Sequence, residues 1–107
     1  MKFRVIVTPE AQAGIRSAFE YIRERAPLNA AKWIRALYRK IDTLERLPQR
    51  CSFAREREFL EEDLRQLVFK SHRMVLRVDL DAKTVYVLHF RHTKQSTLGS
   101  PSEDDDL

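Results

Sequence analysis

The stretch from Asp63 to Gln95 constrains the fold more than any other part of this chain. It reads DLRQLVFKSHRMVLRVDLDAKTVYVLHFRHTKQ and is rich in Val, Leu, Phe and Tyr, which favour strands. Two breaks, at Lys70-Ser71-His72 and at Asp81-Ala82-Lys83, divide it into three runs of strand length. The pattern predicts a three-stranded antiparallel meander that forms the core of the fold.

The segment before the meander predicts a strand and then a helix. Apolar residues alternate along Lys2 to Val7, which is the period of a strand covered on one face. Thr8 is suited to cap a helix and Pro9 to fill its first position. A first helix is therefore expected to begin at Pro9 and to end near Arg25.

A second helix is expected over residues 30–46, with Asn29 as its cap. Its apolar face carries Trp33, which we interpret as a core residue and not as part of a cofactor pocket, and we expect no cofactor. Two amphipathic helices with so short a link should form an antiparallel hairpin on one face of the sheet. The predicted class is α+β with the order β-α-α-β-β-β, and residues 49–62 are interpreted as a loop.

The composition predicts one small domain in a reducing compartment. The chain has 107 residues, and we expect residues 1–95 to form a single domain. Cys51 is the only cysteine, so no internal disulfide can form, and the cytoplasm is the expected location. No apolar run is long enough to cross a membrane, and the apolar start of the sequence is too short for a signal peptide.

The charge is unevenly distributed. The sequence carries 20 basic and 16 acidic residues, a net charge of +4. Four acids lie in the last five residues, so residues 1–102 have 20 basic against 12 acidic side chains, a net charge of +8. Such a surface favours an anionic partner, either nucleic acid or an acidic protein, with simple solubility as the alternative. Residues 96–107 are poor in apolar side chains and are expected to form a disordered acidic tail.

The middle run of the meander separates its residues into two sets. The apolar set, which should hold the helices, consists of Met74, Leu76, Val78 and Leu80. The other set consists of Arg73, Val75, Arg77 and Asp79, and it predicts an open, cationic sheet face. Arg73 and Arg77 on that face are either a contact for a partner or a solvated row.

In its order of elements and in several segments, the chain resembles the RelE/ParE superfamily of toxins from bacterial type II toxin–antitoxin modules. The resemblance runs from about Phe3 to Lys94 and is closest to the ParE-like, or plasmid-stabilisation, branch. The segments that carry it are VIVTPEAQAGI, AAKWIRALYRKIDTLERLP, LRQLVF, HRMVLRV and VYVLHFRHTKQ. It implies a partner antitoxin whose C-terminal segment wraps the toxin, within a toxin–antitoxin hetero-oligomer. RelE-like members cut messenger RNA in the ribosome, whereas ParE-like members poison DNA gyrase.

Cleavage of RNA would need a base, an acid and cations that stabilise the phosphorane. The resemblance implies Arg65, Arg73 and His92 as that set, acting without a metal, and a carboxylate could come from Glu56, Glu58 or Glu61. The tyrosine that follows the last strand in RelE-like nucleases has no counterpart here, because His92 is followed by Thr93-Lys94-Gln95. This departure favours a toxin that binds its target over one that cuts RNA.

We therefore expect a ParE-like toxin that binds gyrase. The alternatives are a ribosome-dependent nuclease, or an inactive homologue that only binds antitoxin and co-regulates its operon, so enzymatic activity stays open. The residues expected to contact the target or the antitoxin are Arg65, Arg73, Arg77, His89, Arg91, His92 and Lys94.

Some of these residues also have a purely structural interpretation. Arg65 has acids beside it, and a pair with Glu62 or Asp63 would be an ordinary ion pair at a strand edge. His89 and His92 lack a cysteine partner, so we expect no metal site. Nothing beside Cys51 in the sequence marks a nucleophile.

Overall fold

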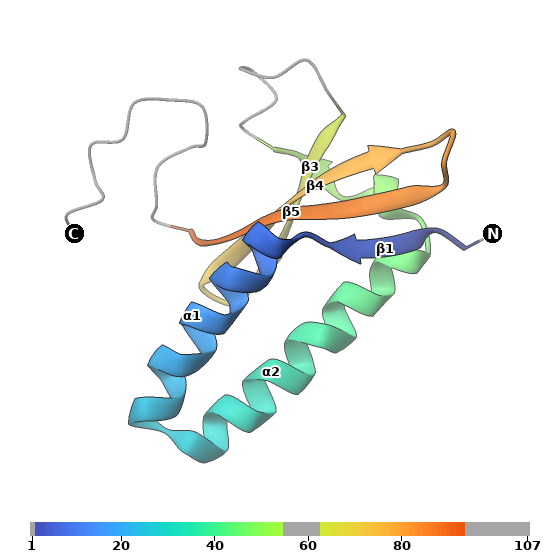
Figure 1. The fold of residues 1–107 in the computed structure, drawn as a ribbon. Coiled ribbons are helices and arrows are strands. Elements are labelled where there is room, and N and C mark those ends of the chain that lie inside the picture. Colours follow the sequence, from blue (N-terminus) through green and yellow to red (C-terminus); the bar gives the residue numbers. More distant parts are fainter. Residues whose placement is uncertain (1, 55–62, 94–107) are drawn as a thin grey trace, which may run out of the picture.

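The structure, a computed structural model, describes residues 2–54 and 63–93 and shows one mixed sheet with both long helices on the same side of it (Figure 1). The strands follow the order β1-β5-β4-β3-β2 across the sheet. The elements are β1 Arg4–Val7, α1 Pro9–Arg25, α2 Pro27–Asp42, β2 Ser52–Phe53, β3 Leu64–Phe69, β4 His72–Asp79 and β5 Thr84–His92, with 3-10 turns η1 Thr43–Glu45 and η2 Pro48–Arg50. The predicted α+β class is confirmed.

The predicted meander is confirmed as β3, β4 and β5, which pair in antiparallel fashion. β1 pairs parallel to β5, so the first and the last strands of the sequence are neighbours in the sheet. Two details differ from the sequence prediction. The first strand begins at Arg4 and not at Lys2, and the stretch interpreted as a loop contains β2, whose two residues pair with β3. Residues 55–62 of that stretch lie outside the described residues.

Thr8 joins the start of α1 to a bulge in β5. Its side chain accepts a hydrogen bond from the backbone N–H of Ala11, as predicted for a cap. Its hydroxyl lies 2.9 Å from the carbonyl oxygen of Val87 and 3.1 Å from that of Leu88. Leu88 is the extra residue of the bulge, because Val75 pairs with His89 and Leu76 with Val87. The cap therefore also places α1 against β5.

The second helix begins earlier than predicted. α2 starts at Pro27, directly after α1, and Ala26 is the single residue between them. Asn29 lies inside the helix, so its prediction as the cap is wrong. Proline needs no N–H partner at a first helical position, and it disfavours helical geometry in the residue before it. Ala26 accordingly has a non-helical backbone, with φ −152° and ψ 80°, and the chain reverses there.

The main core lies between the helices and the sheet. Trp33 is a buried member of this core, with its ring edge-on to Phe69 and Phe90 at centroid distances of 5.8 Å, which confirms it as a core residue. Met74 and Leu76 also face this core, as predicted, but Leu80 is 49% exposed and does not hold the helices. The buried members are Ala11, Ile15, Trp33, Leu37, Ile41, Leu44, Cys51, Phe69, Met74, Leu76, Val85, Val87 and Phe90.

Candidate functional site: a cationic sheet face and a histidine pocket

Three arginines lie on the sheet face that the helices do not cover, and we call them the arginine face: Arg73, Arg77 and Arg91. Met74 and Leu76 belong to the helix-side core, so the residues that alternate with them on β4 point the other way. Arg91 on β5 is the direct cross-strand partner of Arg73. The strands thus place three guanidinium groups on one face, two of them directly opposite each other.

The arginine face is not an open row of solvated cations. Arg73 is only 3% exposed, so its prediction as an open position is wrong. Arg77 is half-buried, and its guanidinium lies 4.3 Å from the ring centroid of Tyr86, its cross-strand partner. Arg73 and Arg77 also have further interactions within the chain. A small apolar cluster of Ala54, Leu64, Val75 and Leu88 lies on the same face and explains part of this burial.

Some buried polar atoms on this face have no hydrogen-bond partner in the described part of the chain. They include Oε1 of Gln66 and Nε of Arg91, and both of these atoms are buried. A buried polar group without a partner costs about 1–3 kcal/mol, so such groups usually mark a place that something else completes. The acceptor of Gln66 and the donor of Arg91 are suited to a polar partner surface. The sequence did not single out Gln66, because its position on this face depends on the pairing register.

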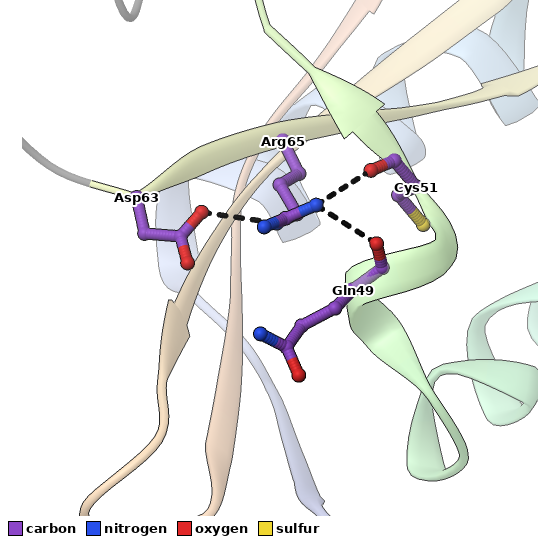
Figure 2. A network of polar contacts seen from close by, with 4 residues as sticks. All are labelled: Gln49, Cys51, Asp63 and Arg65. Carbon is purple, nitrogen blue, oxygen red and sulfur yellow. Dashed lines mark hydrogen bonds and ion pairs between the residues drawn. The ribbon is translucent and has the colours of Figure 1, made fainter.

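Arg65 does not belong to the arginine face. It pairs with Leu76 and so lies on the helix side, where its guanidinium donates to the carbonyl oxygens of Gln49 at 2.8 Å and Cys51 at 3.0 Å (Figure 2). Its Nε lies 3.0 Å from the carboxylate of Asp63, which confirms the ion pair suggested by the sequence. The guanidinium also stacks on Phe53 at 4.4 Å. These contacts connect η2, β2 and the start of β3.

His92 lies at the other end of the helix side, in a pocket that the sequence did not predict. It pairs across the strands with His72, and the two rings are 5.3 Å apart. The two histidines line a cavity of about 520 Å³ together with Ile22, Trp33 and Lys70, and we call it the histidine pocket. The sequence assigned His72 to a turn, so only the tertiary fold shows this pair.

The set Arg65, Arg73 and His92 does not converge. Arg73 faces away from the helices, whereas Arg65 and His92 are on the helix side. On β4, the partners of Arg65 and His92 are Leu76 and His72, which are four residues or about 13 Å apart at the rise of a strand. Described contacts therefore do not join these three side chains into one site.

The remaining predicted residues are placed as follows. His89 Nδ1 lies 3.2 Å from a carboxylate oxygen of Glu10 in the first turn of α1. Lys94 and the acids Glu56, Glu58 and Glu61 lie outside the described residues, as does the predicted acidic tail. Within residues 2–54 and 63–93, no group of three His, Cys, Asp or Glu side chains is placed to hold a metal ion. No helix in the same part of the chain is long and apolar enough to cross a membrane.

Cys51 is expected to be an unreactive thiol. It is 6% exposed, and burial raises its pKa above the ordinary value despite the opposing charges of Arg50, Arg65 and Lys40. Because the thiolate is the nucleophile, alkylation by iodoacetamide near neutral pH should be at least about tenfold slower in the folded protein than in urea. Mass spectrometry of timed samples would measure both rates. Equal rates would show that the thiol is accessible.

A family model described as the ParE toxin of the type II toxin-antitoxin system, parDE, matches residues 5–97. Among curated proteins, no significant match is found. A chain from the chromosomal ParDE TA system of P. aeruginosa is similar in fold, with a TM-score of 0.71 and 14% identity over 87% of this chain and 98% of that one.

A chain from the toxin-antitoxin complex RelBE2 of Mycobacterium tuberculosis is also similar. Its TM-score is 0.60 and its identity 20%, over 86% of this chain and 92% of that one. At these identities the two structures support the fold alone. The family model, by contrast, matches nearly the whole described chain. This protein therefore belongs to the ParE toxin family of type II toxin-antitoxin systems.

Proposed function

We propose that this toxin binds DNA gyrase and blocks supercoiling, and that a cognate antitoxin neutralises it in the cytoplasm by wrapping its C-terminal segment around the toxin. Membership of the ParE family supports the toxin role and the antitoxin partner. The observation that carries the choice of target is the separation of Arg65, Arg73 and His92.

Metal-independent cleavage of RNA needs its acid, base and cations within hydrogen-bond reach of one phosphate. Arg65 is held by two carbonyl oxygens and a carboxylate, and His92 lies in the histidine pocket. Neither shares a sheet face with Arg73. This arrangement favours a toxin that acts by binding, which is also what the missing tyrosine after β5 suggests.

The arginine face is the surface we assign to the target. Arg91 presents a buried Nε–H, and Gln66 a buried carbonyl oxygen, that a partner would complete. Arg77 stacks on Tyr86, so its guanidinium plane is held in a fixed position. Arginine and tyrosine are enriched among the residues that dominate protein–protein affinity. An acidic surface of gyrase fits this face by charge, and the net charge of the toxin would speed the encounter.

The test is DNA supercoiling by purified gyrase with the purified full chain and no ribosomes. The wild type should block supercoiling, and Arg91→Gln and Arg77→Gln should each need about tenfold more protein for the same block. Arg35→Gln is the matched control, because Arg35 is an exposed arginine on α2, on the opposite side of the sheet. It should behave as the wild type does.

Two results would contradict the proposal. One is an absence of any block together with codon-positioned cuts in messenger RNA when ribosomes are present, which would identify a nuclease. The other is an absence of both activities and of harm to cells on expression, which would identify an inactive homologue. Urea unfolding of each variant separates loss of contact from loss of fold.

A further inference from the structure

His72 and His92, which we call the histidine pair, form the cross-strand pair at one end of the sheet. His72 begins β4 directly after the turn at Lys70 and Ser71, and β5 ends at His92. Beyond the pair, the backbone N–H of Thr93 donates to the carbonyl oxygen of Ser71 at 2.8 Å. The strands are thus close to their last contact here, so the packing of the two rings matters for keeping this end closed.

The ring of His72 packs among aromatic side chains of the core. It stacks on Phe90 at a centroid distance of 4.7 Å and an interplanar angle of 9°, and it lies edge-on to Trp33 of α2 at 6.0 Å. His72 therefore connects the end of the sheet to the helical hairpin. A neutral imidazole suits this apolar contact, whereas a charged imidazole is disfavoured away from water.

The hydrogen bonding of His72 shows the same preference for the neutral form. Its Nδ1 atom is buried, and no group in the described part of the chain forms a hydrogen bond with it. A neutral imidazole can leave this nitrogen without a proton, but a protonated imidazole carries an N–H donor on both nitrogens. Protonation would therefore bury a charged donor without an acceptor, which is destabilising.

The charges around His72 also oppose its protonation. The titratable and cationic groups that line the pocket come from α1, the turn and β5, and they are Tyr21, Lys70 and His92. α2 and β3 face His72 with the uncharged Trp33 and Phe69, and the described lining contains no acid. Burial, and then the neighbouring His92, lower the pKa of His72.

We propose that the histidine pair is a pH-sensitive switch, which closes the end of the sheet over the helical hairpin while both rings are neutral and opens it when His72 is protonated. A charged His72 ring leaves Phe90 and Trp33 for water, and the pairing of β4 with β5 is lost at this end. The buried members of the main core include no histidine, so the opening is local and the rest of the core stays packed.

The opening reaches the arginine face through the backbone. Arg73 follows His72 on β4, Arg91 precedes His92 on β5, and the two arginines are direct cross-strand partners. Loss of pairing at this end therefore separates them, and a weaker block of gyrase at acid pH follows. That consequence rests on the proposed function, whereas the switch does not. The experiments on the switch contain no gyrase, so the failure of either is distinguishable.

The direction of the pH effect follows from proton binding. The folded protein holds the pKa of His72 below the value of about 6.5 that a histidine has in water, so the unfolded and the opened chain bind the proton more tightly. The stabilisation by the closed pair is complete above about pH 6.5 and decreases as the pH falls below it. Ordinary carboxylates change charge below about pH 5, so comparing about pH 7.5 with about pH 5.5 isolates the histidines.

The test uses Trp33, the only tryptophan of the sequence, as a reporter beside His72. Urea unfolding of the full chain, followed by tryptophan fluorescence, should have a midpoint at least about 0.3 M lower at about pH 5.5 than at about pH 7.5. His72→Phe keeps a ring that can stack on Phe90 but takes up no proton, so its midpoint should change by less than half as much. Equal changes in the wild type and His72→Phe would overturn the proposal.

His89→Gln is the control for the loss of a histidine as such. His89 lies beside the carboxylate of Glu10, at 3.2 Å, and not in the histidine pocket. A carboxylate stabilises a charged imidazole, so removal of His89 should leave a midpoint change at least as large as that of the wild type. A smaller change in His89→Gln than in His72→Phe would assign the pH effect to His89 and overturn the proposal.

A further measurement needs no variant. The sequence has three histidines, and their ring protons can be followed by NMR as the pH is lowered. His72 should titrate at the lowest pH of the three, and the fluorescence of Trp33 should shift to longer wavelength over the same range as the ring becomes exposed. A His72 signal that titrates at about pH 6.5 or above would overturn the proposal.

The chain also offers a matched pair of lysine variants. Lys70 and Lys83 are both exposed turn residues with positive φ, 55° and 52°, and of the two only Lys70 lines the pocket. Aspartate tolerates this backbone conformation, and at position 70 it places a carboxylate near His72. Lys70→Asp should therefore reduce the midpoint change between the two pH values, whereas Lys83→Asp should not. Equal effects of the two variants would overturn the proposal.

Discussion

Replacement of Gly14 by alanine is expected to lower the free energy of unfolding by about 1–3 kcal/mol, because the added methyl group overpacks the contact between α1 and β5. A Cβ atom built at Gly14 would lie 2.6 Å from the carbonyl oxygen of Phe90 and 3.4 Å from its Cβ. The first of these is a backbone atom of a paired strand, so it cannot move aside as a side chain would. The helix must shift away from the sheet, and the core contacts of Ile15 loosen with it.

The sign of this change in the free energy of unfolding shows whether tertiary packing or local helix propensity dominates at Gly14. In an exposed helix the same substitution would stabilise by about 0.5–1 kcal/mol, because alanine is the better helix former. Ser17→Ala is the control, since Ser17 is exposed on the same helix and should show a small gain. The midpoint and slope of urea unfolding would measure both variants. A Gly14→Ala protein more stable than the wild type would show that α1 does not approach β5 this closely.

Gly14 also illustrates what the sequence could predict. The start of α1 was predictable, because Thr8 and Pro9 act on the backbone beside them. The three meander strands were predictable for a similar reason, since their turns and apolar runs are local. The reason for a glycine at position 14 was not, because it depends on Phe90, which is far away in the sequence. The bulge at Leu88, which sets the register of Phe90, has no local signal either.

The candidate site divides in the same way. Alternation along β4 correctly placed Arg73 and Arg77 on the face opposite Met74 and Leu76. It could not predict that Arg73 is 3% exposed, because burial depends on what covers a face and not on period. The histidine pocket was missed because the pairing of His72 with His92 needs the register of two strands. Sequence periodicity predicted on which face of the sheet a side chain lies, but only the tertiary structure showed which side chains are neighbours.

Replacement of Arg65 by alanine is expected to lower the free energy of unfolding by about 1.5–3 kcal/mol, the range for hydrogen bonds to a charged group. Arg65 has a side chain only 13% exposed, and it bonds to Gln49, Cys51 and Asp63 while stacking on Phe53. Without it, two carbonyl oxygens lose their charged donor. β2 has only two residues and, within the described part of the chain, pairs with β3 alone, so it depends on this contact.

Arg65→Lys tests whether charge or geometry matters. A lysine keeps the charge and has three N–H groups, but they all sit on one nitrogen, which cannot occupy both the Nε position beside Asp63 and the Nη1 position beside the two carbonyl oxygens. It should therefore recover less than half of the loss. The urea midpoint measures this, and Arg35→Lys on the exposed face of α2 should remain within about 0.5 kcal/mol of the wild type.

The same variants decide whether Arg65 is a structural or a target-contacting residue. If it is structural, Arg65→Ala should still block supercoiling at a low temperature at which circular dichroism shows that it remains folded. The block should be lost on warming as the protein unfolds. If the urea midpoint is unchanged and the block is lost at every temperature, Arg65 contacts the target directly, as the sequence resemblance implied. The network in Figure 2 predicts the first result, because the guanidinium is already bonded to three groups of its own chain.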